Sequence, residues 1–120
     1  MATEFGKELR KIRIDHDELL KDMAKKLDVT ISYLSAVEHG KREVPEKWVN
    51  EITKLYNLSD DYKEKLYDLA IMSKKKVSID LEDINDNKKN TALAFARKID
   101  ILTDDDIADI QRILNSKEDD

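Results

Sequence analysis

Residues 23–38 read MAKKLDVTISYLSAVE, and the rest of the chain is organised around this stretch. Apolar side chains recur at helical spacing in two short runs, one ending at Leu27 and one continuing through Leu34 and Val37. The link between them, residues 28–30, is long enough only for a tight turn. Thr30 is a good N-cap for the second helix, because its hydroxyl can accept a hydrogen bond from an open backbone N–H. Two short helices joined this closely must cross steeply, which predicts a helix-turn-helix arrangement.

The residues around this motif predict five helices packed on one core. Asp17 is a plausible N-cap for the helix before the turn, which would carry Leu19 and Leu20, and Gly40 suits a left-handed helix end. Pro45 suits the first position of the fourth helix, and Ser59 can cap the fifth. Three further segments carry apolar residues at helical spacing: Phe5, Leu9, Ile12 and Ile14; Trp48, Val49, Ile52, Leu55 and Tyr56; Tyr62, Leu66, Leu69 and Ala70.

Three motifs can be compared with known sequences: LRKIR (9–13), MAKKLDVT (23–30) and SYLSAVEHGKR (32–42). Through them, residues 5–59 resemble the Cro/cI-like (XRE) family of DNA-binding regulators, with Glu38 and Gly40-Lys41-Arg42 at the family's usual spacing. The resemblance implies a lambda-repressor-like helix-turn-helix domain over residues 1–73, whose second motif helix enters the major groove of DNA. It also implies a structural ion pair between Glu38 and Arg13.

The resemblance predicts which side chains meet DNA. The base-facing positions hold no Arg, Lys, Gln or Asn, the residues that make bidentate base contacts. Direct readout would therefore rest on thymine-methyl contacts from Ile31 and Ala36, with Ser32 and Tyr33, while Lys41 contacts phosphate. Leu19-Leu20 replaces the family's usual Thr-Gln, so one side-chain phosphate contact is missing. The complete predicted set is Thr30, Ile31, Ser32, Tyr33, Ser35, Ala36, His39, Lys41 and Arg42.

The C-terminal third follows a boundary at Lys74-Lys75-Lys76, whose basic side chains could mark either a linker or a phosphate contact. Residues 77–81, VSIDL, alternate apolar and polar, which predicts a short strand. A lone strand needs a partner from outside the chain, and a second copy is the simplest supply. Two helices would follow, one from about Asp86 and one from Thr103, whose TDDD is a capping-box pattern. We expect a dimerisation module over residues 77–115 that uses Val77, Ile79, Leu81, Leu93 and Phe95, then a frayed acidic tail over residues 116–120.

Composition narrows the functional classes. The net charge is −5, but residues 1–76 hold 16 Lys and Arg against 15 Asp and Glu, whereas residues 77–120 hold 6 against 12. The acidity therefore lies away from the predicted reading helix. The chain has no cysteine, which excludes thiolate chemistry and disulfides, and no arrangement of nucleophile and base or Gly-rich phosphate loop is visible. We expect a mainly α, cytoplasmic protein without enzymatic activity, cofactor, metal or membrane segment.

Two functional hypotheses follow. The first is a sequence-specific transcriptional regulator, a homodimeric repressor whose two heads read a palindromic operator in double-stranded DNA. The second is an antitoxin-type or phage-encoded inhibitor, in which the acidic module, residues 77–120, binds a partner protein while the head represses its own operon. The two hypotheses are compatible with each other.

Overall fold

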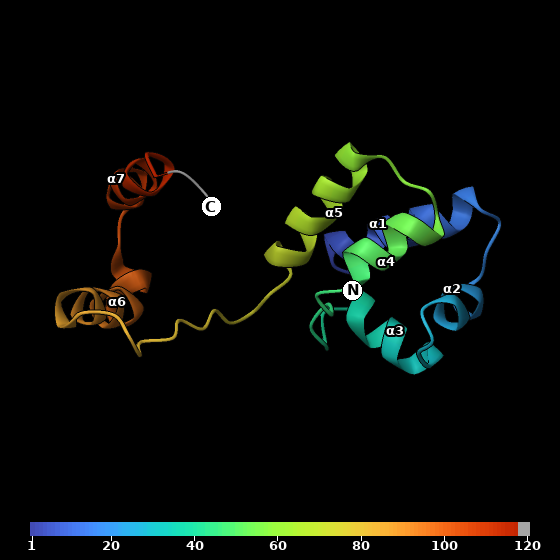
Figure 1. The fold of residues 1–120 in the computed structure, drawn as a ribbon, viewed down its shortest axis with the longest axis horizontal. Helices are drawn as coiled ribbons and strands as arrows, with labels where there is room; N and C mark the ends of the chain where they lie inside the picture. Colours follow the sequence, from blue (N-terminus) through green and yellow to red (C-terminus); the bar gives the residue numbers. More distant parts are fainter. Residues whose placement is uncertain (118–120) are drawn as a thin grey trace. The chain divides into compact units, whose positions relative to one another are not determined.

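The computed structural model describes residues 1–117, and its regular structure is helical, as predicted (Figure 1). The chain divides into two compact units, Met1–Val77 and Ser78–Asp120. No helix in the described part of the chain is long and apolar enough to cross a membrane.

The first unit holds five helices: α1 (Glu4–Asp15), α2 (Leu20–Lys26), α3 (Ile31–Glu38), α4 (Trp48–Leu55) and α5 (Asp60–Met72). One core joins them, and every helix contributes to it. Burying this much apolar surface is the main stabilising term of a domain this size. Its members are Phe5, Leu9, Ile12, Met23, Ala24, Leu27, Leu34, Val37, Trp48, Val49, Ile52, Tyr56 and Leu66.

Two predicted helix starts are wrong. Asp17 does not cap α2; it adopts a left-handed backbone with φ 54°, and the helix begins after Leu19, whose N–H donates to the Asp22 carboxylate at 2.8 Å. Pro45 does not open α4, because its carbonyl accepts from the Trp48 N–H in a turn that precedes the helix. The proposed caps Thr30 and Ser59 are both present, each accepting from a backbone N–H three residues on.

The apolar stripe of the first two helices is narrower than predicted. Ile14 and Leu19 are 63% and 62% exposed, because each lies beside the left-handed turn that separates α1 from α2. Ile14 lies within α1 but off the buried face that carries Ile12, and Leu19 precedes the first residue of α2.

The second unit consists of α6 (Asp86–Lys98), the 3₁₀ turn η1 (Ile99–Ile101) and α7 (Asp104–Asn115). The predicted capping box is present, with the Asp106 N–H donating to Thr103 Oγ1 and the Thr103 N–H to Asp106 Oδ2. The predicted strand at residues 77–81 is wrong: the segment has no regular structure. Alternation alone cannot form a strand where no neighbouring segment supplies ladder hydrogen bonds. Of the predicted frayed tail, residues 118–120 lie outside the described residues.

Candidate functional site

The turn between α2 and α3 fixes how the two motif helices meet. Asp28 takes a left-handed backbone with φ 57°, and the Val29 N–H donates back to the Ala24 carbonyl at 3.0 Å. Ala24 is only 1% exposed, so its small side chain lies at the helix contact. Thr30 then starts α3 by accepting from the Tyr33 N–H at 3.0 Å. A helix-turn-helix corner results, with α3 seated on the core through Leu34 and Val37.

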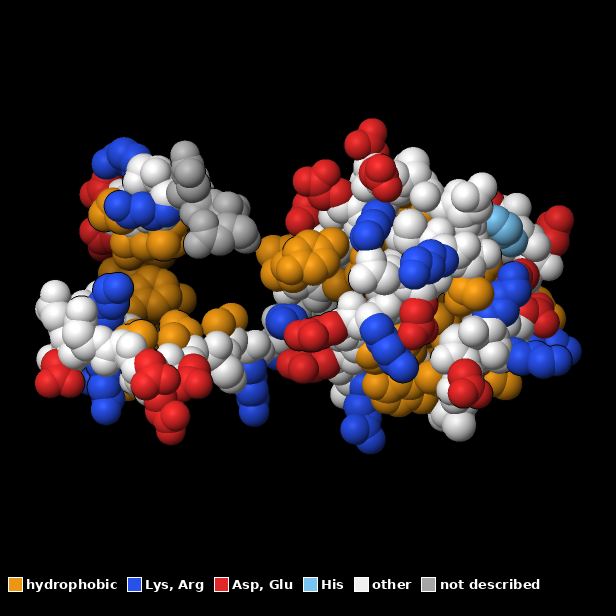
Figure 2. Space-filling view, in the orientation of Figure 1, with side chains coloured by type: hydrophobic (Ala, Val, Ile, Leu, Met, Phe, Trp, Pro, Cys, Tyr) orange, Lys and Arg blue, Asp and Glu red, His pale blue; other side chains and the backbone are white. Residues whose placement is uncertain are grey.

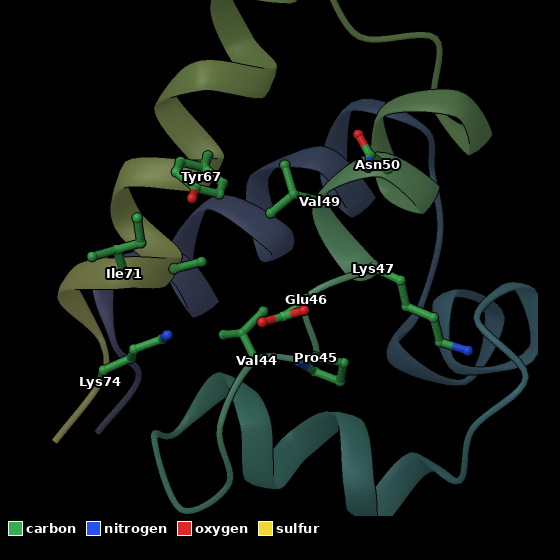
Figure 3. Close-up of a pocket in the computed structure, with 10 residues that line it drawn as sticks. Val44, Pro45, Glu46, Lys47, Val49, Asn50, Tyr67, Ile71 and Lys74 are labelled. Carbon is green, nitrogen blue, oxygen red and sulfur yellow. The ribbon is translucent and has the colours of Figure 1, made fainter. Parts of the chain in front are cut away.

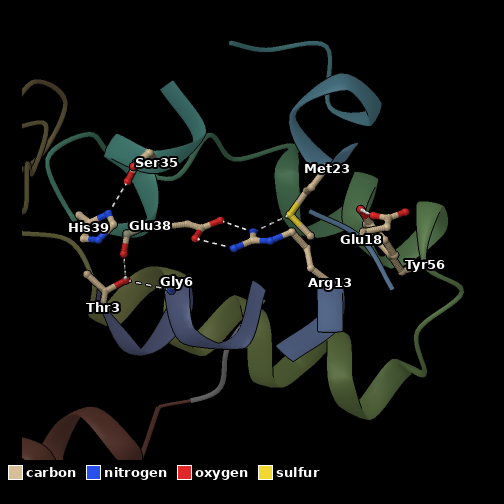
Figure 4. A network of polar contacts seen from close by, with 9 residues as sticks. All are labelled: Thr3, Gly6, Arg13, Glu18, Met23, Ser35, Glu38, His39 and Tyr56. Atoms are coloured by element: carbon tan, nitrogen blue, oxygen red, sulfur yellow. Dashed lines mark hydrogen bonds and ion pairs between the residues drawn. The ribbon is translucent and has the colours of Figure 1, made fainter. Parts of the chain in front are cut away.

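A buried ion pair holds the far end of α3. Arg13 of α1 donates to both carboxylate oxygens of Glu38, at 2.5 and 3.1 Å, and each side chain is 8% exposed (Figure 4). The guanidinium also lies 3.4 Å from the Met23 sulfur of α2. The pair predicted from the sequence is therefore present. It links α1, α2 and α3 at one point, which fixes the orientation of α3.

The backbone at the same end is joined to the start of α1. The N–H and hydroxyl of Thr3 both donate to the Glu38 carbonyl, at 2.9 and 3.3 Å, while the hydroxyl accepts from the Gly6 N–H (Figure 4). Gly6 is needed here, because a Cβ at this position would lie 2.2 Å from the Glu38 carbonyl oxygen. Sequence reasoning missed this contact, since one glycine within a helical pattern does not reveal its neighbour.

The predicted DNA-contacting residues differ in how far they are exposed. Thr30, Ile31, Ser32 and His39 are exposed, with Ile31 at 51%, and Lys41 and Arg42 follow in an exposed loop. Tyr33, Ser35 and Ala36 are half-buried. The N-terminal turn of α3 is therefore the most accessible part of the helix.

Tyr33 and His39 make contacts within the domain that limit which of their atoms can meet DNA. The Tyr33 ring packs edge-on against Trp48, with ring centroids 5.9 Å apart and planes at 88°. His39 Nδ1 donates to the Ser35 carbonyl at 2.8 Å, which leaves Nε2 as the ring nitrogen free to meet another group (Figure 4). Tyr33 is therefore partly a packing residue, whereas His39 keeps one polar atom available.

A basic cluster adjoins the end of the motif. Lys41 and Arg42, from the loop after α3, line the same 210 Å³ hollow as Lys75 and Lys76, from the segment that follows α5, with Glu43 as the acidic neighbour. None of these four cations forms an ion pair within residues 1–117. The sequence signal was the Lys74-Lys75-Lys76 run, but the fold alone shows that it lies beside the motif.

Two carboxylates, those of Glu8 and Glu18, form hydrogen bonds that join elements of the first unit. Burial raises the pKa of Glu8, but hydrogen bonds from Tyr62, Lys11 and Lys65 outweigh burial and lower the pKa below its ordinary value. Burial, together with the hydrogen bond to Glu8, raises the pKa of Tyr62 to about 12.

Glu18 repeats this arrangement with Lys26 and Tyr56. Burial again acts to raise the carboxyl pKa, and the hydrogen bonds from both partners lower it. These groups are structural, because each is satisfied by side chains of the same unit.

A hollow of about 520 Å³ between the loop before α4 and α5 is separate from the predicted site (Figure 3). None of the residues predicted to contact DNA lines it. Its walls bring Val44, Val49 and Ile71 together with Lys47 and Lys74, and contain no nucleophile beside a general base. Within the part of the chain that is described, no cluster of His, Asp and Glu could hold a metal ion.

The predicted dimerisation residues are largely accessible. Val77 and Ile79 are 86% and 63% exposed, Leu93 and Phe95 are each 40% exposed, and Leu81 is half-buried.

Comparison with family models, with curated proteins and with solved structures yields no match to this chain.

Proposed function

We propose that this chain is a sequence-specific DNA-binding transcriptional regulator of the Cro/cI-like (XRE) family, a homodimeric repressor that acts in the cytoplasm on a two-fold symmetric operator. The observation that supports it best is the placement of α3. The helix is anchored at both ends and along its inner face, its N-terminal turn stands exposed, and four unpaired cations lie just beyond its C-terminal end. A rigid exposed helix flanked by positive charge suits the major groove.

Base readout in this proposal rests on small and apolar groups. Ile31 offers methyl groups for thymine C5-methyl contacts, and Ser32 offers a hydroxyl that both donates and accepts. Thr30 uses its oxygen to accept from the Tyr33 N–H, which leaves its proton for a phosphate. The readout we expect is therefore rich in A·T pairs.

Phosphate binding rests on the cluster of Lys41, Arg42, Lys75 and Lys76. Residues 1–76 have a net charge of only +1, so their overall charge attracts DNA weakly. The four unpaired cations are grouped in one place, and they can therefore contact the same stretch of phosphates. Each phosphate neutralised adds about 0.9 to the slope of log affinity against log salt. Two heads double these contacts, which is why the proposal includes a homodimer.

A binding titration of the full chain tests the proposal. Its own upstream DNA is compared with a scrambled duplex at two salt concentrations, and we expect tighter binding to the upstream DNA, with two chains per site. Ile31→Glu should remove this preference, and Leu55→Glu, an equivalent change at an exposed position of α4, should preserve it. Equal affinity for both duplexes would refute sequence-specific readout.

The basic cluster has its own test. Lys75→Gln with Lys76→Gln should lower the salt slope by up to about 2 per head and weaken binding to both duplexes alike. Lys54→Gln with Lys63→Gln, exposed lysines of α4 and α5, is the matched control and should leave the slope unchanged. An unchanged slope in the first pair would remove Lys75 and Lys76 from the interface.

A further inference from the structure

The second unit leaves its apolar surface open. Among residues 78–117 none is fully buried, and the hydrophobic side chains of α6 and α7 gather along the space between the two helices (Figure 2). A pair of short helices without a buried core is unstable by itself in water. Open apolar surface of this kind is typical of an interaction site.

The open surface has the form of a groove. Two adjoining hollows of about 530 and 440 Å³ lie along α6 and α7, and both are lined by Phe95 and Ile110. Ile113 and Leu114, which extend the first hollow, are 62% and 64% exposed. Ala92 and Ala94 lie on the α6 side, where small side chains allow another helix to approach closely.

The charges of the two helices are opposite and equal. The segment forming α6 holds four basic residues and one acid, a net of +3, while α7 holds four acids and Arg112, a net of −3. The net negative charge of the C-terminal third is therefore not spread evenly, because α6 on one side of the groove is basic and α7 on the other side is acidic. A partner of uniform charge would be attracted by one helix and repelled by the other.

We propose that the groove binds a second copy of this chain, with α6 of each copy packed against α7 of the other around a two-fold axis. In this arrangement each helix lies against a helix of opposite charge, because an isologous interface contains every α6–α7 contact twice. Lys88 and Lys98, which line the two hollows, would then lie near the acids of the partner's α7. Four helices would enclose the apolar groove residues in one core.

This inference deepens the proposed function, from which it takes the homodimer, and names the surface that forms it. It differs from pairing through residues 77–81, since the described chain has no strand there. The interface residues become those of the groove, chiefly Phe95, Ile110, Ile113 and Leu114.

Charge reversal in the full chain tests the pairing. Lys88→Glu with Lys98→Glu, and separately Asp104→Lys with Asp109→Lys, should each raise the dimer dissociation constant on the order of 100-fold, because four attractive contacts become repulsive. Mixing the two variants should restore dimers containing one of each chain. Lys89→Glu with Arg97→Glu makes the same charge change on α6 away from the hollows, and should weaken the dimer far less.

Sedimentation velocity measures the dimers, and native mass spectrometry identifies mixed ones. Fluorescence of Trp48, the only tryptophan, checks that each variant keeps a folded first unit. A dimeric wild type with variants that stay dimeric, or with no mixed dimers, overturns the α6–α7 pairing. So does a monomeric wild type. A wild type that dimerises in this way but binds both duplexes equally refutes the regulator alone.

Discussion

Removing the carboxylate of Glu38 should destabilise the first unit severely. Glu38→Leu leaves the Arg13 guanidinium, itself 8% exposed, with the Met23 sulfur as its remaining partner near by. Breaking one side of a buried ion pair typically costs about 3–5 kcal/mol, because the remaining charge is uncompensated. A domain of this size is stabilised by about 5–15 kcal/mol in total, so the variant should lose at least about a fifth of its stability.

The matched control replaces both charges. Arg13→Met with Glu38→Leu removes the pair without stranding a charge, and should be more stable than Glu38→Leu alone and within about 1 kcal/mol of wild type. Urea unfolding followed by the fluorescence of Trp48, 1% exposed in the core, measures all three chains. A loss below about 1 kcal/mol for Glu38→Leu, or a double variant no more stable than the single one, would refute the reasoning.

Three further predictions concern the elements that hold α1 and α3. Gly6→Ala should destabilise the fold by about 1–3 kcal/mol in urea unfolding, although alanine usually favours a helix, because its Cβ would clash with the Glu38 carbonyl. Glu8 has a lowered pKa in the fold, so its contribution is present above its ordinary value of 4.5 and is lost as pH falls below it. The urea midpoint should therefore decline less steeply below pH 4.5 in Glu8→Gln than in wild type, and equal slopes would contradict this. Thr30→Ala should cost about 1 kcal/mol by removing the cap of α3, while Thr30→Ser, which keeps the hydroxyl, should stay near wild type; a chemical denaturation series checks both.

The amino-acid sequence determined the features that depend on neighbours along the chain. Apolar spacing predicted the helices, and Thr30, Ser59 and Thr103 marked three of their starts, because a cap needs only a side chain and the next few N–H groups. The local sequence pattern gave a wrong helix start where the backbone takes a left-handed turn. The left-handed residue Asp17 delayed α2, and that conformation is open to many aspartates without being signalled by any of them.

The pair of Arg13 and Glu38 was predicted through a family resemblance, since 25 residues separate its members. Only the tertiary structure decided the arrangements that no short window contains: the close approach of Gly6 to Glu38, and the position of Lys41 and Lys75 around one hollow. It also removed the strand at residues 77–81, because a strand exists only where a second segment supplies its hydrogen bonds. Alternation in one segment specifies half of such a ladder, and the fold decides whether the other half is there.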